Sequence, residues 1–177
     1  MNTQSFNAAV TTRPRSSRRA AWAADNHQGL AATGDAGQDK NDALGTISVA
    51  PTVLLVEDNH INQVVALEFL AMMGLQTRLA TNGQDALAAC ARAAPDLVLM
   101  DVQMPGMDGL ECTRQMRLLQ QSGALAYFPI LALTAHALES DVAASHSAGM
   151  DEHLTKPLDF VALRARLGCW IRMPDLN

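Results

Sequence analysis

Aromatic side chains, cysteines and long apolar runs are all scarce in this sequence of 177 residues. Aromatic residues make up 4% of the chain and hydrophobic residues 49%, so a core must be built mainly from aliphatic side chains. No apolar run approaches the roughly 18 to 20 residues needed to cross a bilayer. We therefore expect no membrane contact by the chain itself.

The three cysteines, Cys90, Cys112 and Cys169, are odd in number, widely spaced and without C-x-x-C pairing. This pattern is typical neither of a disulfide framework nor of a zinc site. We interpret them as reduced thiols and expect a cytoplasmic protein. The net charge of −5 includes no basic excess, so we expect no nucleic acid as the main partner.

Residues 1–48 differ from the rest, because small and polar residues dominate and large aliphatic ones are few. Such a segment buries too little apolar surface to offset the entropy lost on ordering. We predict a disordered or linker-like N-terminal tail over 1–48 and one folded domain over 49–177. The first twenty residues carry arginines and no acid, a composition typical of an organellar transit peptide and also of a basic flexible arm.

From Pro51 onward, short apolar runs alternate with helical patterns. The predicted strands cover 53–56, 76–80, 97–101, 129–134 and 152–155, and the predicted helices cover 61–72, 86–91, 109–121, 137–147 and 160–171. Asn59 and Asp159 are suited to capping helix starts, and Gly74 and Gly149 to ending helices. Apolar residues recur at helical spacing on the first and last helices: Ile61, Val65, Phe69 and Met72, then Phe160, Leu163, Leu167, Trp170 and Ile171.

This strict alternation of strands and helices predicts an α/β fold. Nearly continuous apolar strands indicate a parallel sheet that is covered by helices on both faces. Right-handed crossovers leave few topologies. We predict a doubly wound five-stranded sheet in the flavodoxin-like order 2-1-3-4-5, with its switch point between the first and third strands.

One stretch, residues 97–109, organises the rest of the chain. Four apolar residues lead directly into Asp101, and a turn with Pro105 and Gly106 follows. Asp101 therefore lies at the carboxyl end of a buried strand, the edge where open α/β sheets bind ligands. Taken alone, the stretch is equally compatible with an aspartate that only caps the strand or the next turn.

Other polar residues end the neighbouring strands. Glu57 and Asp58 follow the first strand, Thr134 ends the fourth, and Lys156 follows the fifth. Each has an ordinary explanation alone, such as a helix-start charge or a strand cap, but in a parallel sheet they all meet at one edge. Crowded carboxylates repel unless a cation compensates, and an oxygen-only donor set suits Mg²⁺. Threonine and lysine add a hydroxyl and a point charge suited to a phosphoryl group on a carboxylate nucleophile.

At these residues the sequence closely resembles the receiver domain of two-component response regulators, over about residues 51–172. Four motifs carry the resemblance, in order and at matching spacing: Val53-Leu54-Leu55-Val56-Glu57-Asp58-Asn59, the segment from Leu99 to Gly109, Ile130-Leu131-Ala132-Leu133-Thr134-Ala135, and Leu154-Thr155-Lys156-Pro157. The amino-acid sequences of these motifs are most similar to those of receivers attached to hybrid sensor histidine kinases.

The resemblance implies a role for each polar residue at this edge. Asp101 would accept a phosphoryl group from a phosphohistidine of a histidine kinase or a histidine phosphotransfer protein. Asp58 and Asp101, with the backbone carbonyl of Gln103, would hold Mg²⁺, and Glu57 would act through a water of the metal.

The resemblance also implies a conformational switch. Thr134 and Lys156 would contact the new phosphoryl group, and His153 stands where the family more often has tyrosine or phenylalanine. A half-exposed strand histidine is the other interpretation of His153. Gln103 and His136 lie two residues past Asp101 and Thr134, where the family tunes the lifetime of the aspartyl phosphate.

We therefore expect a phosphorelay switch and no enzyme beyond self-phosphorylation and self-dephosphorylation. Phosphorylation would change a face built by the fourth helix, the fifth strand and the fifth helix, where a downstream protein would bind. The chain would act either as a stand-alone receiver or as the receiver end of a hybrid kinase. Two alternatives are a receiver-like module that is never phosphorylated and a Mg²⁺-dependent phosphatase with an aspartate nucleophile. The phosphatase would need a second aspartate where this chain has Gln103, whose amide cannot transfer a proton.

Overall fold

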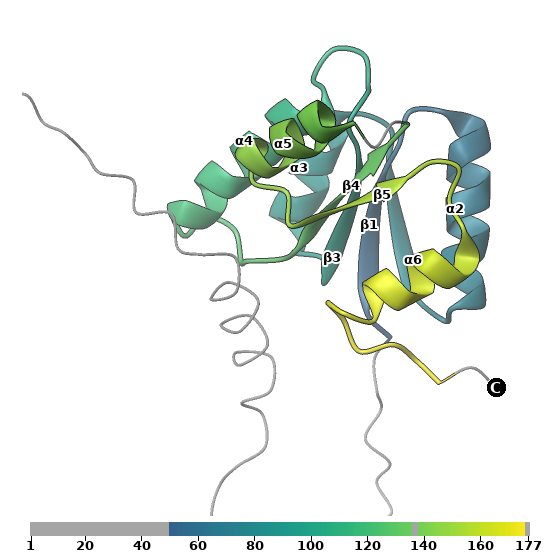
Figure 1. The fold of residues 1–177 in the computed structure, drawn as a ribbon. Helices are drawn as coiled ribbons and strands as arrows, with labels where there is room; N and C mark the ends of the chain where they lie inside the picture. The colour runs from purple at the N-terminus through teal and green to yellow at the C-terminus, as the bar shows by residue number, and fades with distance from the viewer. Residues whose placement is uncertain (1–49, 136–137, 176–177) are drawn as a thin grey trace, which may run out of the picture. The chain divides into compact units, whose positions relative to one another are not determined.

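The computed structural model describes residues 50–135 and 138–175, so the predicted N-terminal tail and His136 lie outside the described residues. Within them, strands and helices alternate as predicted (Figure 1). The elements are β1 (Thr52–Val56), α2 (His60–Met72), β2 (Gln76–Ala80), α3 (Gly83–Arg92), β3 (Leu97–Asp101), α4 (Gly109–Gln121), β4 (Ile130–Thr134), α5 (Glu139–Ala148), β5 (Glu152–Thr155) and α6 (Phe160–Leu167).

The five strands form one parallel sheet in the order β2-β1-β3-β4-β5, which confirms the predicted topology. β2 pairs with β1 on one side, and β3 pairs with β1 on the other side. All five strands of a parallel sheet end at the same edge, so the residues that follow β1 and β3 lie on either side of the switch point.

Helices cover both faces of the sheet, as predicted. Figure 1 shows α2 and α6 on one side of the sheet and α3, α4 and α5 on the other. Every residue of β3 and β4 is buried, because strands covered on both faces bury both rows of side chains. Toward α3 and α4 the core is one cluster that includes Met100, Cys112 and Met116. On the opposite face, Phe69 of α2 meets Phe160 of α6 edge to face, with ring centroids 5.5 Å apart.

The predicted helix signals are present. The side chain of Asn59 accepts hydrogen bonds from the backbone N–H groups of Ile61 and Asn62, and the side chain of Asp159 accepts one from Ala162. Each satisfies donors that the first turn of a helix leaves without partners. Gly149 ends α5 with φ of +103°, a left-handed conformation that favours glycine.

The apolar residues at helical spacing on α2 do not mark its buried side. Ile61 is 74% exposed, Val65 40% and Met72 56%, and Phe69 is half-buried. The buried side of α2 instead carries Gln63, Ala66 and Leu70. Because α2 is apolar around most of its circumference, apolar spacing alone does not identify its buried face.

One expectation about the helices is wrong: the last helix was predicted to extend to Ile171, but α6 ends at Leu167, so Trp170 and Ile171 lie beyond it. Both are still buried. The backbone N–H of Trp170 donates to the carbonyl of Leu167, three residues back, which tightens the chain into a turn. The indole N–H of Trp170 also donates to Glu152 at 2.8 Å and so fastens this turn to β5.

The cysteines are thiols, as expected, with Cys90 and Cys112 buried and Cys169 exposed. Burial raises the pKa of Cys90 to about 11 and that of Cys112 to about 12, so both stay protonated and unreactive at neutral pH. No helix in the described parts of the chain has the length and apolar character to cross a bilayer.

Candidate functional site

The residues after β1, β3 and β5 meet at the carboxyl edge of the sheet. The ammonium group of Lys156 lies 2.7 Å from a carboxylate oxygen of Glu57 and 2.7 Å from one of Asp101. Glu57 is 1% exposed and Asp101 4%. Two buried carboxylates therefore share one lysine, and the negative charge exceeds the positive charge at this point.

The carboxylate of Asp101 is held by the backbone of Gln103 as well as by Lys156. Its Oδ1 accepts a hydrogen bond of 3.0 Å from the backbone N–H of Gln103, while Oδ2 faces the lysine. Burial raises the pKa of Asp101 above its usual value, and the hydrogen bonds from Lys156 and Gln103 act in the opposite direction. These two donors thus favour the ionised carboxylate, which is the form that acts as a nucleophile.

Gly109, the first residue of α4, fits closely against the backbone of Asp101. A Cβ atom on Gly109 would lie 2.0 Å from the carbonyl oxygen of Asp101, and the Gly109 N–H donates to Val102 at 3.0 Å. No residue with a side chain fits here without moving Asp101. Gly109 was predicted to lie at a helix start, but its close approach to Asp101 was not predicted.

The first turn of α2 holds Glu57. Its Oε1 accepts hydrogen bonds from the side-chain amide of Asn62 at 3.1 Å and from the backbone N–H of Asn59 at 3.2 Å. The buried side chain of Gln63 donates to the Glu57 carbonyl at 2.8 Å. Neither Asn62 nor Gln63 was predicted as a site residue, although both lie on the helical turn that follows the acidic pair.

The three carboxylates fit a small divalent cation. Ligand oxygens of Glu57, Asp58 and Asp101 all lie within 4.8 Å of one another, and Asp58 is exposed where the others are buried. Among residues 50–135 and 138–175, this is the only group of three or more His, Cys, Asp or Glu side chains able to hold a metal. An oxygen-only set with one solvent-facing side is typical of Mg²⁺, which keeps several of its waters.

The remaining predicted site residues lie around this cluster. Thr134 ends β4, is 6% exposed, and its carbonyl accepts a hydrogen bond of 2.8 Å from the backbone N–H of Lys156. The side chain of Gln103 is exposed. His153 pairs in register with Ala132, and its ring meets that of His146 on α5 at 71°, with centroids 6.2 Å apart. The side chain of His153, on β5, is half-buried and lies beside α5.

The parallel sheet in the order 2-1-3-4-5, with helices on both faces, is a CheY-like fold. The family model described as the response regulator receiver domain matches residues 53–168. The chain belongs to this family.

Known proteins agree with this assignment. The chain is 42% identical to the sensor protein GacS of Pseudomonas syringae pv. syringae over 111 residues, which cover 63% of this chain and 12% of GacS. The chain therefore matches a small part of that relative.

Two solved structures are similar over about two thirds of the chain. The receiver domain of the sensor histidine kinase PA1611 from Pseudomonas aeruginosa PAO1 has a TM-score of 0.62 and 35% identity, covering 69% of this chain and 98% of that one; it holds a magnesium ion in its active-site cleft. The receiver domain of Saccharomyces cerevisiae Ssk1, in complex with the histidine phosphotransfer protein Ypd1, has a TM-score of 0.64 and 33% identity, covering 69% of this chain and 90% of that one.

Proposed function

We propose that the chain accepts a phosphoryl group on Asp101 from a phosphohistidine, in a Mg²⁺-dependent step of a phosphorelay. The observation that carries the proposal is the buried Asp101 carboxylate, joined to Lys156 within a cluster of three acids. A histidine kinase or a histidine phosphotransfer protein would be the donor, as the Ypd1–Ssk1 complex suggests. We further propose a cytoplasmic location, in keeping with the reduced thiols.

In the transfer, a carboxylate oxygen of Asp101 attacks phosphorus while the bond from phosphorus to the imidazole nitrogen breaks. The nitrogen keeps the electron pair of that bond, and the product is an aspartyl phosphate. Asp58, Asp101 and the carbonyl of Gln103 would hold Mg²⁺, with Glu57 acting through a bound water. The ion supplies positive charge to the phosphoryl oxygens. Lys156, 2.7 Å from Asp101, is placed to supply a second positive charge.

The donor must cover the carboxyl edge of the sheet for its phosphohistidine to reach Asp101. The first turns of α2, which follow Glu57 and Asp58 along the chain, expose apolar side chains: Ile61 is 74% exposed and Val64 53%. Exposed apolar side chains beside a site are typical of protein-binding surfaces. We propose that the donor docks on these turns of α2.

Phosphorylation would then act as a switch. The product carries close to two negative charges where one was paired before. Thr134 and Lys156 would contact the phosphoryl group and favour a second arrangement of the loops after β4 and β5. We propose His153 as a residue that responds to this change, and Gln103 as a residue that tunes the phosphoryl lifetime; His136, proposed for the same tuning, lies outside the described residues.

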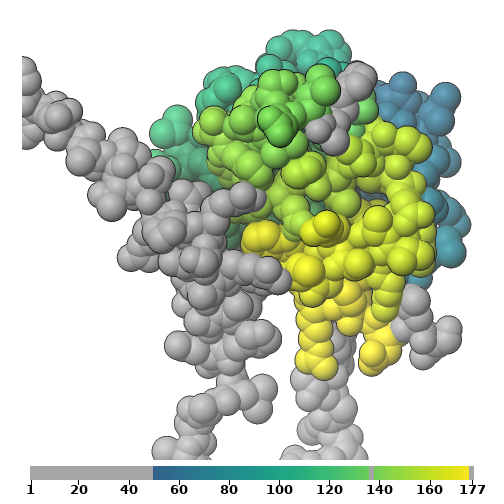
Figure 2. Space-filling view, viewed as in Figure 1, coloured from purple at the N-terminus to yellow at the C-terminus, as the bar shows by residue number. Residues whose placement is uncertain are grey.

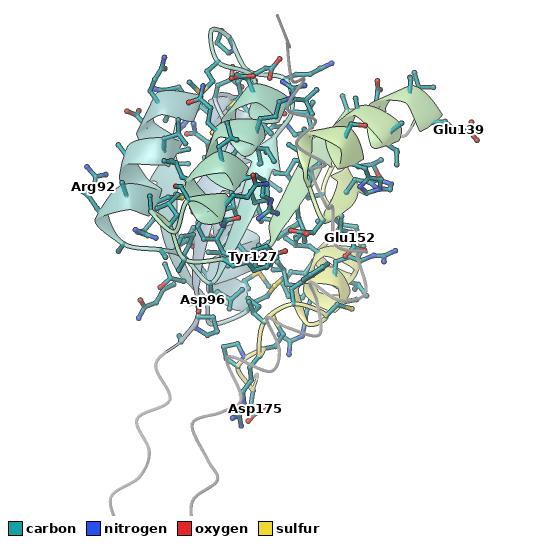
Figure 3. All side chains as sticks on the ribbon, turned by 90° about the vertical axis from the view of Figure 1, so that its left-hand side faces the viewer. Arg92, Asp96, Tyr127, Glu139, Glu152 and Asp175 are labelled. Carbon is teal, nitrogen blue, oxygen red and sulfur yellow. The ribbon has the colours of Figure 1, made fainter. Side chains whose placement is uncertain are left out.

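The face formed by α5, β5 and α6 would carry the signal to a downstream protein. This face is turned toward the viewer in Figure 2. Leu138, at the N-cap of α5, makes no side-chain cap hydrogen bond. Figure 3 shows Glu139 at the outer end of this helix, away from Glu152 and Tyr127. A helix start without a side-chain cap is suited to moving.

Incubation with a small-molecule phosphodonor and Mg²⁺ tests the proposal. We expect the intact mass to rise by one phosphoryl group, and we expect Asp101→Asn or chelation of Mg²⁺ to abolish the rise. Asp108→Asn is the matched control, because Asp108 is an exposed N-cap and asparagine caps helices equally well. An unchanged mass of the wild-type chain would instead support a receiver-like module that is not phosphorylated.

A further inference from the structure

The side chain of Asn62 joins the acidic cluster to α2 through Glu57. The two carboxylate oxygens of Glu57 have different partners: Oε2 pairs with Lys156 at 2.7 Å, and Oε1 accepts from the Asn62 amide at 3.1 Å. One oxygen is thus tied to the loop after β5 and the other to the first turn of α2. A carboxylate bonded on both sides is held against rotation.

Asn62 is itself fixed in place. It is half-buried, and its backbone N–H donates to the capping side chain of Asn59 at 3.2 Å. The next residue, Gln63, is 7% exposed and donates to the backbone carbonyl of Glu57 at 2.8 Å. Two consecutive residues of α2 therefore hydrogen-bond Glu57: Asn62 bonds its side chain and Gln63 its backbone carbonyl.

The hydrogen bond from Asn62 to Glu57 matters because Lys156 pairs with two carboxylates. Its ammonium group serves Glu57 and Asp101 together, and a new phosphoryl group on Asp101 would draw it away from Glu57. The hydrogen bonds that Oε1 of Glu57 accepts from the Asn62 amide and from the backbone N–H of Asn59 do not involve the lysine. They therefore keep Glu57 directed at the acidic cluster in both states, and the Asn62 amide is the side-chain donor among them.

We infer that Asn62 is a positioning residue that sets Mg²⁺ affinity by holding Glu57. This inference rests on the proposed function, in which Glu57 contacts the ion through a water. Hydrogen-bonding partners outside the first coordination layer of a metal typically contribute about 10- to 100-fold in affinity. Because Asn62 is one contact further away, we expect Asn62→Leu to raise the dissociation constant for Mg²⁺ about three- to tenfold.

The test is calorimetric titration of the unphosphorylated full chain with MgCl₂. Leucine matches asparagine in size but lacks the donor, and Asn62→Ala, a strong helix former, replaces it if the leucine variant does not fold. Gln115→Leu is the matched control: it removes an amide-to-carboxylate bond of 3.0 Å, to Glu111, on an exposed part of α4. We expect the control to bind Mg²⁺ as the wild type does, and Asn62→Gln, which retains an amide donor, to recover part of the affinity.

The outcomes separate the inference from the proposed function. If the wild type binds Mg²⁺ and the dissociation constants of the wild type and Asn62→Leu differ by less than about twofold, the inference is overturned. The proposed function is unaffected by that result. A wild-type chain that does not bind Mg²⁺ would overturn the Mg²⁺-dependent function and the inference with it. In the phosphorylation reaction, a positioning role of Asn62 predicts that Asn62→Leu raises the Mg²⁺ concentration giving half the maximal rate. A general loss of structure would also lower the rate at saturating Mg²⁺.

Discussion

The two edges of the sheet each contain a buried ion cluster, and the clusters are built differently. At the carboxyl edge, Lys156 serves Glu57 and Asp101. At the amino edge, near the start of β4, Arg117 of α4 pairs with Asp151 at 2.5 Å. Both clusters join distant segments of the chain, but only the second balances one positive charge against one negative charge.

The amino-edge pair satisfies its donors and acceptors within the protein. Arg117 donates to the carbonyls of Gly149 and Phe128 at 2.9 Å each, as well as to Asp151. Asp151 accepts from the Tyr127 hydroxyl at 3.0 Å and from the Ile130 N–H at 2.9 Å. Figure 3 labels Tyr127 on this part of the molecule. A rigid guanidinium fork with several carbonyl acceptors is suited to fixing structure.

The carboxyl-edge cluster has negative charge in excess and a flexible lysine, which is suited to a site that gains and loses a charged ligand. Burial of an ion pair therefore does not by itself indicate function. The balance of charge and the rigidity of the cation distinguish the two edges.

Removing the cation of the amino-edge pair is expected to give the largest change in stability. Arg117→Met leaves Asp151 buried without its counter-charge, so the free energy of unfolding should fall by about 3–5 kcal/mol in urea unfolding. Arg114→Met, on the same helix, removes an exposed pair with Glu111 and should cost less than about 1 kcal/mol. Equal losses in the two variants would contradict a structural role special to Arg117.

Filling the space at Gly109 is expected to disturb the carboxyl edge. The new methyl group of Gly109→Ala would meet the Asp101 carbonyl, so unfolding should become easier by about 1–3 kcal/mol. Phosphorylation of Asp101 should slow as well, because its backbone must move. Gly168→Ala is the control, since a Cβ there meets its nearest atom at 3.4 Å. Normal phosphorylation of Gly109→Ala would show that the site tolerates a displaced backbone.

The smallest expected effect is a pH-dependent gain in stability in Asp101→Asn. Burial raises the pKa of Asp101 above its usual value of 3.8, so the folded chain keeps a proton that the unfolded chain has lost. Stability of the wild type therefore falls as pH rises from about 4 through the raised pKa, and asparagine removes that fall. Urea unfolding in chelator should show an advantage of Asp101→Asn that grows with pH over this window. A constant difference would refute the assigned cause.

Much of the fold was predictable because the signals are local. Buried strands such as Leu97–Asp101 are short apolar runs bounded by turns, and their alternation with helices leaves few topologies. The grouping of Glu57, Asp58 and Asp101 followed from the same topology, since the carboxyl ends of parallel strands share one edge. The roles of these residues in phosphoryl transfer stay predictions.

Other features were not predictable, because they depend on contacts that no local pattern encodes. The partners of Arg117 lie up to 34 residues away, and nothing in its neighbourhood distinguishes it from the exposed Arg114. The close approach of Gly109 to Asp101 depends on where α4 packs. The buried face of α2 depends on which neighbours are available, and the outward position of Ile61 shows this.

The hydrogen bond of 2.8 Å from the backbone of Lys156 to the carbonyl of Thr134 has one more consequence. It ties together two segments that are proposed to sense the phosphoryl group, so a displacement at the end of β4 would also move the loop before α6. If both segments respond to the phosphoryl group as proposed, they would move as one unit, and the surface around β5 would undergo a single combined movement rather than two independent ones.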